Sequence, residues 1–393
     1  MPLPTEQTST NSAKAAQVVL LGVPFDPTIN FFTNKLGFRV DAIFPADAPS
    51  VAMLSGHGLS IRLQPPDGDH TTAGTLRLVC SDPLVLGEGA DVMVAPNGTR
   101  VQLIDIDAPL PMPPVAQSLV VARLADDAQW GVGRAGMQYR DIIPGRQGGR
   151  FIGSHIRIPG GGPVPDYVHY HKVRFQMIYC HKGWVRLVYE DQGEPFVLHA
   201  GDCVLQPPEI RHRVLESGDD LHVIELGCPA EHETLADHDT PLPTGRSIAS
   251  RNFGGQRFVR HNASVASWHP WRVAGFEHRD IGIGAATDGL AGVRVARPIG
   301  GGTTPDPAFV SHNAEFVFLF VLSGSVTFEH AGDDTWLPAA SYELTEGDTV
   351  VVPAALAHRL TECSADLQLL DVTLPDLIEL TPVSAAWRGR VAR

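Results

Sequence analysis

The sequence predicts a mainly β protein, and three observations lead to that fold class. Short runs of alternating apolar and polar residues, such as RFIGSHIRI (150–158) and WVRLVYE (184–190), are broken by Gly, Pro and Asp turns. This pattern is typical of an antiparallel sandwich or barrel. The chain of 393 residues also contains 39 glycines and 32 prolines, which favours a turn-rich β protein over a helical one. The third observation is an internal repeat.

Two separate stretches of the sequence recur later in the chain. AGMQYRDI (135–142) returns as AGFEHRDI (274–281). GDCVLQPPEIRHRVLESGDDLHVIEL (201–226) is echoed at a constant offset by GDTVVVPAALAHRLTECSADLQLLDV (347–372). Chance does not align so many positions, so the sequence predicts two copies of one β-rich unit.

The repeat and two proline-rich segments set the predicted domain boundaries. The cluster APLPMPP (108–114) separates the first copy from an N-terminal region of different character, and a connector rich in Pro, His and Asp spans 229–254. The predicted parts, in order, are a disordered tail (1–15), an N-terminal domain (16–107), the two copies (115–228 and 255–378) and a C-terminal tail (379–393).

Composition excludes several classes of partner. The formal net charge of −14 argues against nucleic acid, whose recognition needs a concentrated Lys and Arg surface. The apolar run VVLLGVPF (18–25) is too short to cross a membrane. Five cysteines without a CxxC pair are expected to be free thiols in a reducing compartment. We therefore expect a cytoplasmic protein that binds a small-molecule substrate, with no nucleic acid and no membrane as partner.

The stretch VHYHKVRFQMIYCHKGW (168–184) carries the strongest chemical signal. In an extended chain, residues two positions apart point to the same face, so His169 and His171 should project together. His212, on a neighbouring predicted strand, supplies a third imidazole. Three imidazoles that converge inside a barrel can hold one divalent ion and leave coordination positions open.

The first copy resembles the cupins. Their first motif, His-x-His, four residues, an acid, six residues and Gly, is matched by His169 and His171, with Gln176 in the acid's place and then Gly183. Their second motif is matched by Gly201, Pro207, His212 and Glu216, with Glu209 where Gly is usual. The resemblance implies two tandem cupin jelly-roll barrels, and because paired jelly rolls commonly associate, a homodimer.

The N-terminal region resembles a glyoxalase-type, vicinal-oxygen-chelate module. VPFDPTINFFTNKLGFRV (23–40) resembles its strand-to-helix entry, and PNGTRVQLIDID (96–107) its closing hairpin. The resemblance implies a small α+β domain before the two barrels. Val18 to Leu21 and Gln102 stand where that superfamily carries its metal-binding His and Glu, so we expect no metal there. A lid, a dimerisation surface and a metal-free pocket remain open as roles.

The predicted metal site comprises His169, His171, His212 and Gln176. Gln176 either ligates the ion through its amide oxygen or stands back and hydrogen-bonds water near it. Three neutral imidazoles and a neutral amide leave the full charge on the ion, which makes it a stronger Lewis acid than a site with a carboxylate. Fe(II) is the favoured ion, with Mn, Ni and Zn as alternatives.

The resemblance to cupin dioxygenases implies a metal-dependent oxidoreductase, an Fe(II)-type dioxygenase that acts on a small chelating organic substrate. One alternative keeps the ion as a Lewis acid in a non-redox isomerase or lyase. Another is a non-catalytic bicupin that binds small molecules. The sequence assigns no catalytic residue beyond the metal ligands.

The second copy lacks a complete ligand set. Counting back from Gly324 places Val310, His312 and Val317 in the three ligand slots of the first motif, and His358 matches the third histidine. Two imidazoles hold a metal poorly, so we expect a structural barrel or an apolar pocket.

Strand alternation makes further predictions within the first copy. Counting from Gln176, Ile178 and Cys180 should face inward and Met177 and Tyr179 outward. The following His181 and Lys182 are expected in a hairpin-like turn, in solvent.

Overall fold

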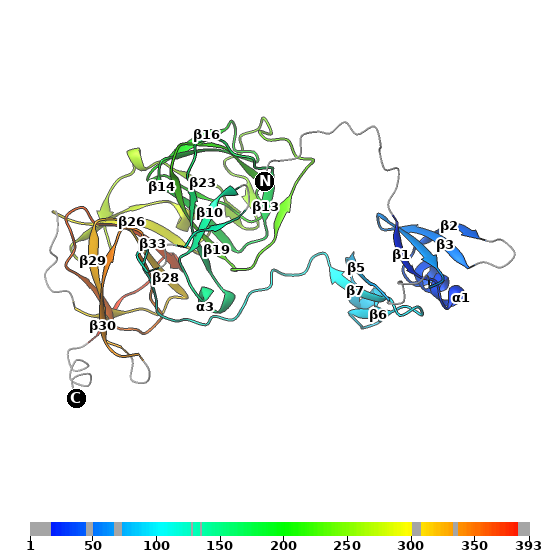
Figure 1. Cartoon of the computed structure of the whole chain (residues 1–393). Coiled ribbons are helices and arrows are strands. Elements are labelled where there is room, and N and C mark those ends of the chain that lie inside the picture. The colour runs from blue at the N-terminus through cyan, green and yellow to red at the C-terminus, as the bar shows by residue number, and fades with distance from the viewer. Residues whose placement is uncertain are drawn as a thin grey trace. The chain divides into compact units, whose positions relative to one another are not determined.

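The structure of this chain, a computed structural model, describes residues 17–44, 50–66, 73–126, 129–133, 136–300, 308–332 and 337–383 (Figure 1). The chain divides into two compact units, with the boundary between Pro109 and Leu110. The predicted disordered tail (1–15) and residues 384–393 of the predicted C-terminal tail lie outside the described residues. Within the described residues, no helix is long and apolar enough to cross a membrane.

The N-terminal unit contains two short modules that each begin with a strand and a helix. The first module comprises β1 (Val18–Leu21), α1 (Phe25–Asn30), η1 (Phe31–Lys35), β2 (Arg39–Phe44), β3 (Val51–Gly56) and β4 (Leu59–Gln64). The second comprises β5 (Thr75–Cys80), α2 (Pro83–Leu86), β6 (Val92–Val94) and β7 (Arg100–Asp105). Their sheets run in the orders β1-β4-β3-β2 and β5-β7-β6, with β1 parallel to β4 and β5 parallel to β7. The α+β character matches the prediction, and the glyoxalase-type assignment stays a prediction.

The second unit consists of two β barrels, each built from two antiparallel sheets. The first barrel comprises β9 (Gly131–Val132), β10 (Gln138–Asp141), α3 (Arg146–Gly149), β11 (Ile152–Ile158), β12 (Gly162–Pro163), β13 (His169–His171), β14 (Phe175–Lys182), β15 (Trp184–Tyr189), β16 (Phe196–His199), β17 (Cys203–Leu205), β18 (His212–Ser217), β19 (Leu221–Cys228) and β20 (Thr234–Ala236). Its sheets have the orders β23-β17-β14-β19-β11-β10-β9, in which β23 spans Val259–His261, and β16-β15-β18-β13-β20. The mainly β class is confirmed.

The second barrel repeats this architecture. It comprises β24 (His269–Pro270), β25 (Phe276–Asp280), α4 (Ile283–Ala286), β26 (Gly292–Pro298), β27 (Val310–Ser311), β28 (Phe316–Ser323), β29 (Ser325–His330), β30 (Ala340–Thr345), β31 (Thr349–Val351), β32 (His358–Thr361), β33 (Gln368–Leu374) and β34 (Thr381–Pro382). Its sheets have the orders β24-β25-β26-β33-β28-β31-β8, in which β8 spans Val120–Ala122, and β30-β29-β32-β27-β34. In the chain segment that connects the two barrels, β21 (Asn252–Phe253) pairs with β22 (Gln256–Arg257), and a turn of 3-10 helix spans Ala263–Val265.

The two barrels exchange strands, which corrects the predicted boundaries. β8 (Val120–Ala122), assigned to the first copy, pairs with β31 of the second barrel, and β23 (Val259–His261), assigned to the second copy, pairs with β17 of the first. β20 of the predicted connector pairs with β13, and β34 lies beyond residue 378. Edge strands join whichever sheet offers an unpaired edge nearby, and a sequence repeat does not record that choice.

The barrels pack through their seven-stranded sheets, and one apolar core spans both of them. The rings of Phe151 and Phe316 stack with centroids 4.0 Å apart at this interface. Figure 1 shows β14 and β19 of the first barrel and β28 and β33 of the second in these facing sheets. Met177 and Tyr179 do face out of their own barrel, as alternation predicts, but they are buried in the shared core.

The prediction that His181 lies in solvent is wrong. Its side chain is only 5% exposed and lies 3.4 Å from the Glu346 carboxylate of the second barrel. Its ring also packs edge-on against Phe320 at 5.5 Å. His181 belongs to the end of β14, whose outer face is covered by the other barrel, whereas the neighbouring Lys182 remains half exposed.

Candidate metal centre

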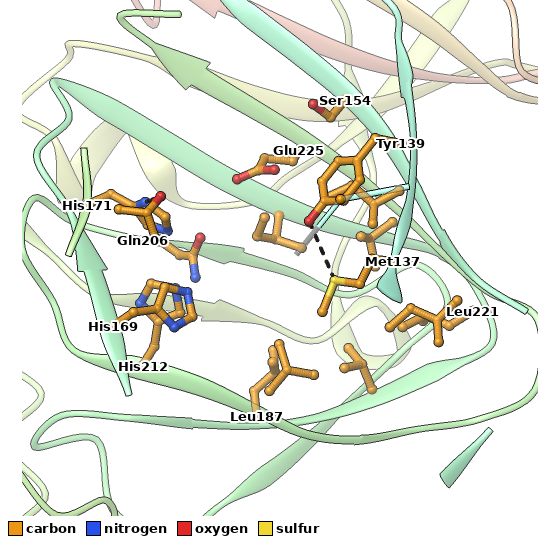
Figure 2. Close-up of a pocket in the computed structure, with 18 of the residues that line it drawn as sticks. Met137, Tyr139, Ser154, His169, His171, Leu187, Gln206, His212, Leu221 and Glu225 are labelled. Carbon is orange, nitrogen blue, oxygen red and sulfur yellow. Dashed lines mark hydrogen bonds between the residues drawn. The ribbon is translucent and has the colours of Figure 1, made fainter. Parts of the chain in front are cut away.

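Three imidazoles converge inside the first barrel (Figure 2). His169 and His171 are the two ends of β13 and are both buried, while the residue between them turns the other way. His212 begins β18 and lies directly opposite His169 in the strand register. One candidate ligand atom from each histidine lies within 4.8 Å of the other two. Strand alternation correctly predicted that His169 and His171 share a face, and His212 lies on a neighbouring strand as expected. That the three hold a metal ion stays a prediction.

Hydrogen bonds fix which ring nitrogen of two of these histidines faces the centre. The Nδ1 atom of His169 lies 2.8 Å from the carbonyl oxygen of Tyr167, and that of His212 lies 3.0 Å from the carbonyl oxygen of Ile210. A carbonyl oxygen only accepts, so in the neutral rings each Nδ1 must carry the proton. In that tautomer the lone pair lies on each Nε2 atom, and this is the form in which an imidazole ligates metal.

His171 is oriented in a comparable way from another strand. Its Nδ1 lies 3.0 Å from the hydroxyl oxygen of Thr234 on β20. This contact comes from the segment predicted to be a connector, so sequence reasoning did not find it. The donor set of three buried imidazoles with Nδ1 engaged fits a first-row divalent ion.

A buried carboxylate stands behind His169. The Oδ1 atom of Asp166 lies 3.7 Å from Nδ1 of His169, and its Oδ2 atom accepts a hydrogen bond of 2.9 Å from the backbone N–H of Val214. Asp166 is 1% exposed. Carboxylates in this position commonly orient metal-binding imidazoles and raise their basicity. The sequence placed this acid three residues before the first histidine, and that spacing was the available signal.

Gln176 is buried on β14 and makes a specific contact. Its Nε2 atom donates a hydrogen bond of 2.6 Å to Oε1 of Glu225. Gln176 is not among the described residues that line the cavity beside the histidines. Because its amide nitrogen donates to the Glu225 carboxylate, only its amide oxygen could serve as a metal ligand. Direct ligation by Gln176 stays a prediction.

Glu225 is the main functional candidate that sequence reasoning missed. It lies on β19, where it pairs in register with Ile178, and its side chain lines the cavity. The repeat itself held a signal, because the alignment of HVIEL (222–226) with QLLDV (368–372) pairs Glu225 with another acid, Asp371. The first barrel thus has a carboxylate near the histidines, supplied by the strand next to the one that the cupin motif predicts.

The cavity around these residues has a volume of about 420 Å³. Figure 2 shows the imidazoles on one side and Met137 and Leu221 on the other, with Glu225 between them. Most of its wall is hydrocarbon, contributed by Met137, Ile152, Ile156, Ile158, Ile178, Val185, Leu187, Val214, Leu221 and Val223. No Lys or Arg is among the described lining residues. The cavity is therefore apolar, with a polar end that carries the three imidazoles.

Cys180 does not line this cavity, although its inward orientation agrees with strand alternation. It faces the barrel interior but packs within the apolar core. Burial raises the pKa of its thiol to about 12, so it remains protonated at neutral pH.

The second barrel repeats the strand pairing of the first but lacks its set of three histidines. Val310 lies opposite His358 in the register that joins His169 to His212. The His312 and His358 rings lie 5.9 Å apart, and burial lowers the pKa of both to about 4.

Comparison with known proteins places a cupin domain in the first barrel. Residues 154–226 match the cupin domain family Cupin_2. No curated protein matches the chain. Among solved structures, a serine-to-alanine mutant of Bacillus subtilis oxalate decarboxylase aligns with a TM-score of 0.49 and 13% identity, covering 69% of this chain and 80% of that one.

Two further solved structures give the same picture. The Lactobacillus farciminis oxalate decarboxylase formate complex aligns with a TM-score of 0.48 and 13% identity, covering 69% of this chain and 92% of that one. A Bacillus subtilis oxalate decarboxylase studied for its Mn(II) centres aligns at 0.46 and 12%, covering 63% and 74%. Likenesses at this level carry no inference about reaction or metal.

Proposed function

We propose that the first barrel is the divalent-metal centre of an enzyme that acts on a small organic substrate. The observation that carries the proposal is the convergence of His169, His171 and His212 in a buried site, with each Nδ1 engaged by the protein. Three imidazoles oriented in this way serve packing poorly, because each needs its own polar partner inside an apolar barrel.

Fe(II) is the proposed ion, with Mn, Ni and Zn as alternatives. When bound, such an ion supplies a Lewis acid and an open position for the substrate. The neutral imidazoles leave its charge intact, and Glu225 provides a nearby negative charge that stabilises a cation at this end of the cavity. The amide of Gln176 holds that carboxylate in place through its hydrogen bond.

The cavity wall indicates the class of substrate. Its hydrocarbon lining favours a molecule with an apolar body, and the imidazoles at one end favour a polar, chelating head group. A small dianion would find no Lys or Arg partner among the described lining residues. We therefore propose a substrate such as an aryl or alkyl catechol, dicarbonyl or hydroxy acid.

Dioxygen-dependent oxidation is the leading reaction class. The apolar wall excludes water from the substrate, which suits oxygen chemistry at a three-histidine site. A second class, isomerase or lyase, is favoured by Glu225, whose carboxylate in the cavity can take a proton from a bound substrate.

Metal analysis and oxygen uptake test these proposals. The purified chain should contain about one equivalent of a divalent metal, and His171→Ala should lose it. His358→Ala, at the equivalent of His212 in the second barrel, should keep the metal. Oxygen uptake with Fe(II) and a candidate catechol supports oxidation, whereas turnover without uptake supports the isomerase or lyase. Full metal content in His171→Ala would contradict the site.

The proposal extends to the N-terminal unit as a glyoxalase-type domain without metal. Its first module has the strand, helix and three strands that this resemblance implies. A cavity of about 280 Å³ lies in this unit beside His57. His57 contacts the carbonyl oxygen of Leu36 at 2.7 Å, which suits a structural histidine beside a metal-free pocket. His70, the other histidine of this N-terminal region, lies outside the described residues. A cytoplasmic homodimer remains part of the proposal.

A further inference from the structure

The second barrel encloses its own cavity of about 330 Å³. Its wall is mainly hydrocarbon, contributed by Val310, Val317, Leu319, Leu360, Ile378 and Leu380. Val310 and Val317 stand where the first barrel has His169 and Gln176, so the ligand slots are filled by apolar side chains. This cavity therefore occupies the same position in its barrel as the first cavity does, but its lining differs in chemistry.

His312 does not offer a metal-binding lone pair. Its Nδ1 atom accepts a hydrogen bond of 3.1 Å from the backbone N–H of Ala314. In the neutral ring the proton must then reside on Nε2, which is the opposite tautomer from that of His169 and His212. The two histidines of this barrel thus cannot act together as a chelating pair in this arrangement.

His358 provides a hydrogen-bond acceptor at the cavity. Its Nδ1 donates to the carbonyl oxygen of Leu356 at 2.9 Å, so the lone pair lies on Nε2. Within the described residues no hydrogen bond engages that Nε2 atom. Burial lowers the pKa of His358 to about 4, so the ring is neutral at pH 7. The ring stacks on Phe328, which fixes its orientation.

The charged groups at this cavity are already compensated. Arg272 binds the Asp371 carboxylate with both terminal nitrogens, one of them at 2.6 Å. Arg359 lies 2.7 Å from the Glu329 carboxylate. Neither guanidinium offers an uncompensated charge, so a carboxylate or phosphate ligand gains little here.

We propose that the second barrel is a metal-free binding site for an uncharged molecule of the phenol or alcohol class. Its apolar body fills the hydrocarbon cavity, and its hydroxyl donates a hydrogen bond to Nε2 of His358. The site is independent of any ion in the first barrel.

Binding of 4-fluorophenol to the full chain tests the proposal. Fluorine NMR in the presence of EDTA should show saturable binding of one equivalent. 4-Fluoroanisole has a similar shape but no hydroxyl proton, so it should bind about fivefold or more weakly. Leu319→Trp narrows the second cavity and should abolish binding. Ile178→Trp, the equivalent change in the first barrel, should leave binding intact.

Three results would overturn the proposal. The first is the absence of saturable binding, and the second is equal affinity for 4-fluorophenol and 4-fluoroanisole. The third is binding that survives Leu319→Trp and is lost in Ile178→Trp, which would place the phenol in the first barrel. The comparison of the two probes uses the unaltered protein, so it holds even if a tryptophan variant fails to fold.

Discussion

The Nε2 atom of Gln176 donates a hydrogen bond of 2.6 Å to the carboxylate of Glu225 on the neighbouring strand. This contact explains why an amide occupies the position where the cupin motif carries an acid. Two carboxylates at that distance would repel each other in a buried site. The cavity still contains a carboxylate, but β19 supplies it instead of β14.

Glu225→Gln separates the roles of this carboxylate. Should Glu225 act as a proton acceptor, the variant is expected to keep its metal and to lose about 100-fold or more in turnover. The measurements are metal content and the rate with the same substrate. Gln206→Glu is unsuitable as a control because it adds a charge, so Ser154→Ala, another lining residue, serves instead. Loss of metal in Glu225→Gln would instead make the carboxylate a ligand.

Asp166→Asn should weaken metal binding without removing a predicted ligand. The carboxylate lies behind His169 and polarises its ring, so its loss is expected to lower metal affinity about 10-fold to 100-fold. Titration with a competing chelator measures the change. Asp220→Asn, which alters an exposed carboxylate beside Arg157, is the matched control. Unchanged affinity in Asp166→Asn would limit Asp166 to a structural role.

The repeated RDI motif should stabilise the interface between the barrels. Arg140 donates to the carbonyl oxygen of Gly347, and Arg279 donates to that of Gly201. Because each bond involves a buried charged donor, Arg140→Ala is expected to cost about 2 kcal/mol or more. Thermal unfolding checks this change.

Arg157→Ala is the control for the interface variant. Its guanidinium pairs with the Asp220 carboxylate at the surface, 2.7 Å away. An exposed pair of this kind contributes about 0–1 kcal/mol. Equal destabilisation by Arg140→Ala and Arg157→Ala would contradict the assigned role of the motif.

The protein should lose stability as the pH falls below about 6.5. Burial, with help from Arg140, lowers the pKa of His155 to about 2, and burial lowers that of His181 to about 4. Between these values and 6.5 the unfolded chain binds protons that the folded chain does not, so stability rises with pH. Each such histidine contributes a slope of up to about 1.4 kcal/mol per pH unit.

Thermal unfolding at pH 7.5 and pH 5.0 measures this effect. His155→Gln should show a smaller difference between the two pH values than the unaltered chain. His155 also contacts His222 at 2.8 Å, and a single substitution therefore removes only part of the dependence. The same difference in both proteins would exclude His155 as a contributor.

Local pattern accounts for what the sequence predicted well. The spacing of His169 and His171 fixed their common face, because side chains of a strand alternate with a period of two. The repeat identified two copies of one unit, and counting back from Gly324 placed Val310 in the slot that His169 occupies in the first copy. These features depend on residues close together in the chain or on a second copy of the same segment, and both can be recognised from the amino-acid sequence.

The tertiary structure decided the features that depend on distant partners. Glu225 lines the cavity and accepts a hydrogen bond from Gln176 only because β19 pairs with β14. Strand alternation shows only that His181 points out of its own barrel. The side chain is buried because that outer face of β14 packs against the second barrel. The strands β8 and β23 joined opposite barrels for the same reason. Which sheet an edge strand joins depends on packing and hydrogen bonding with segments distant in the sequence, so the local sequence does not determine it.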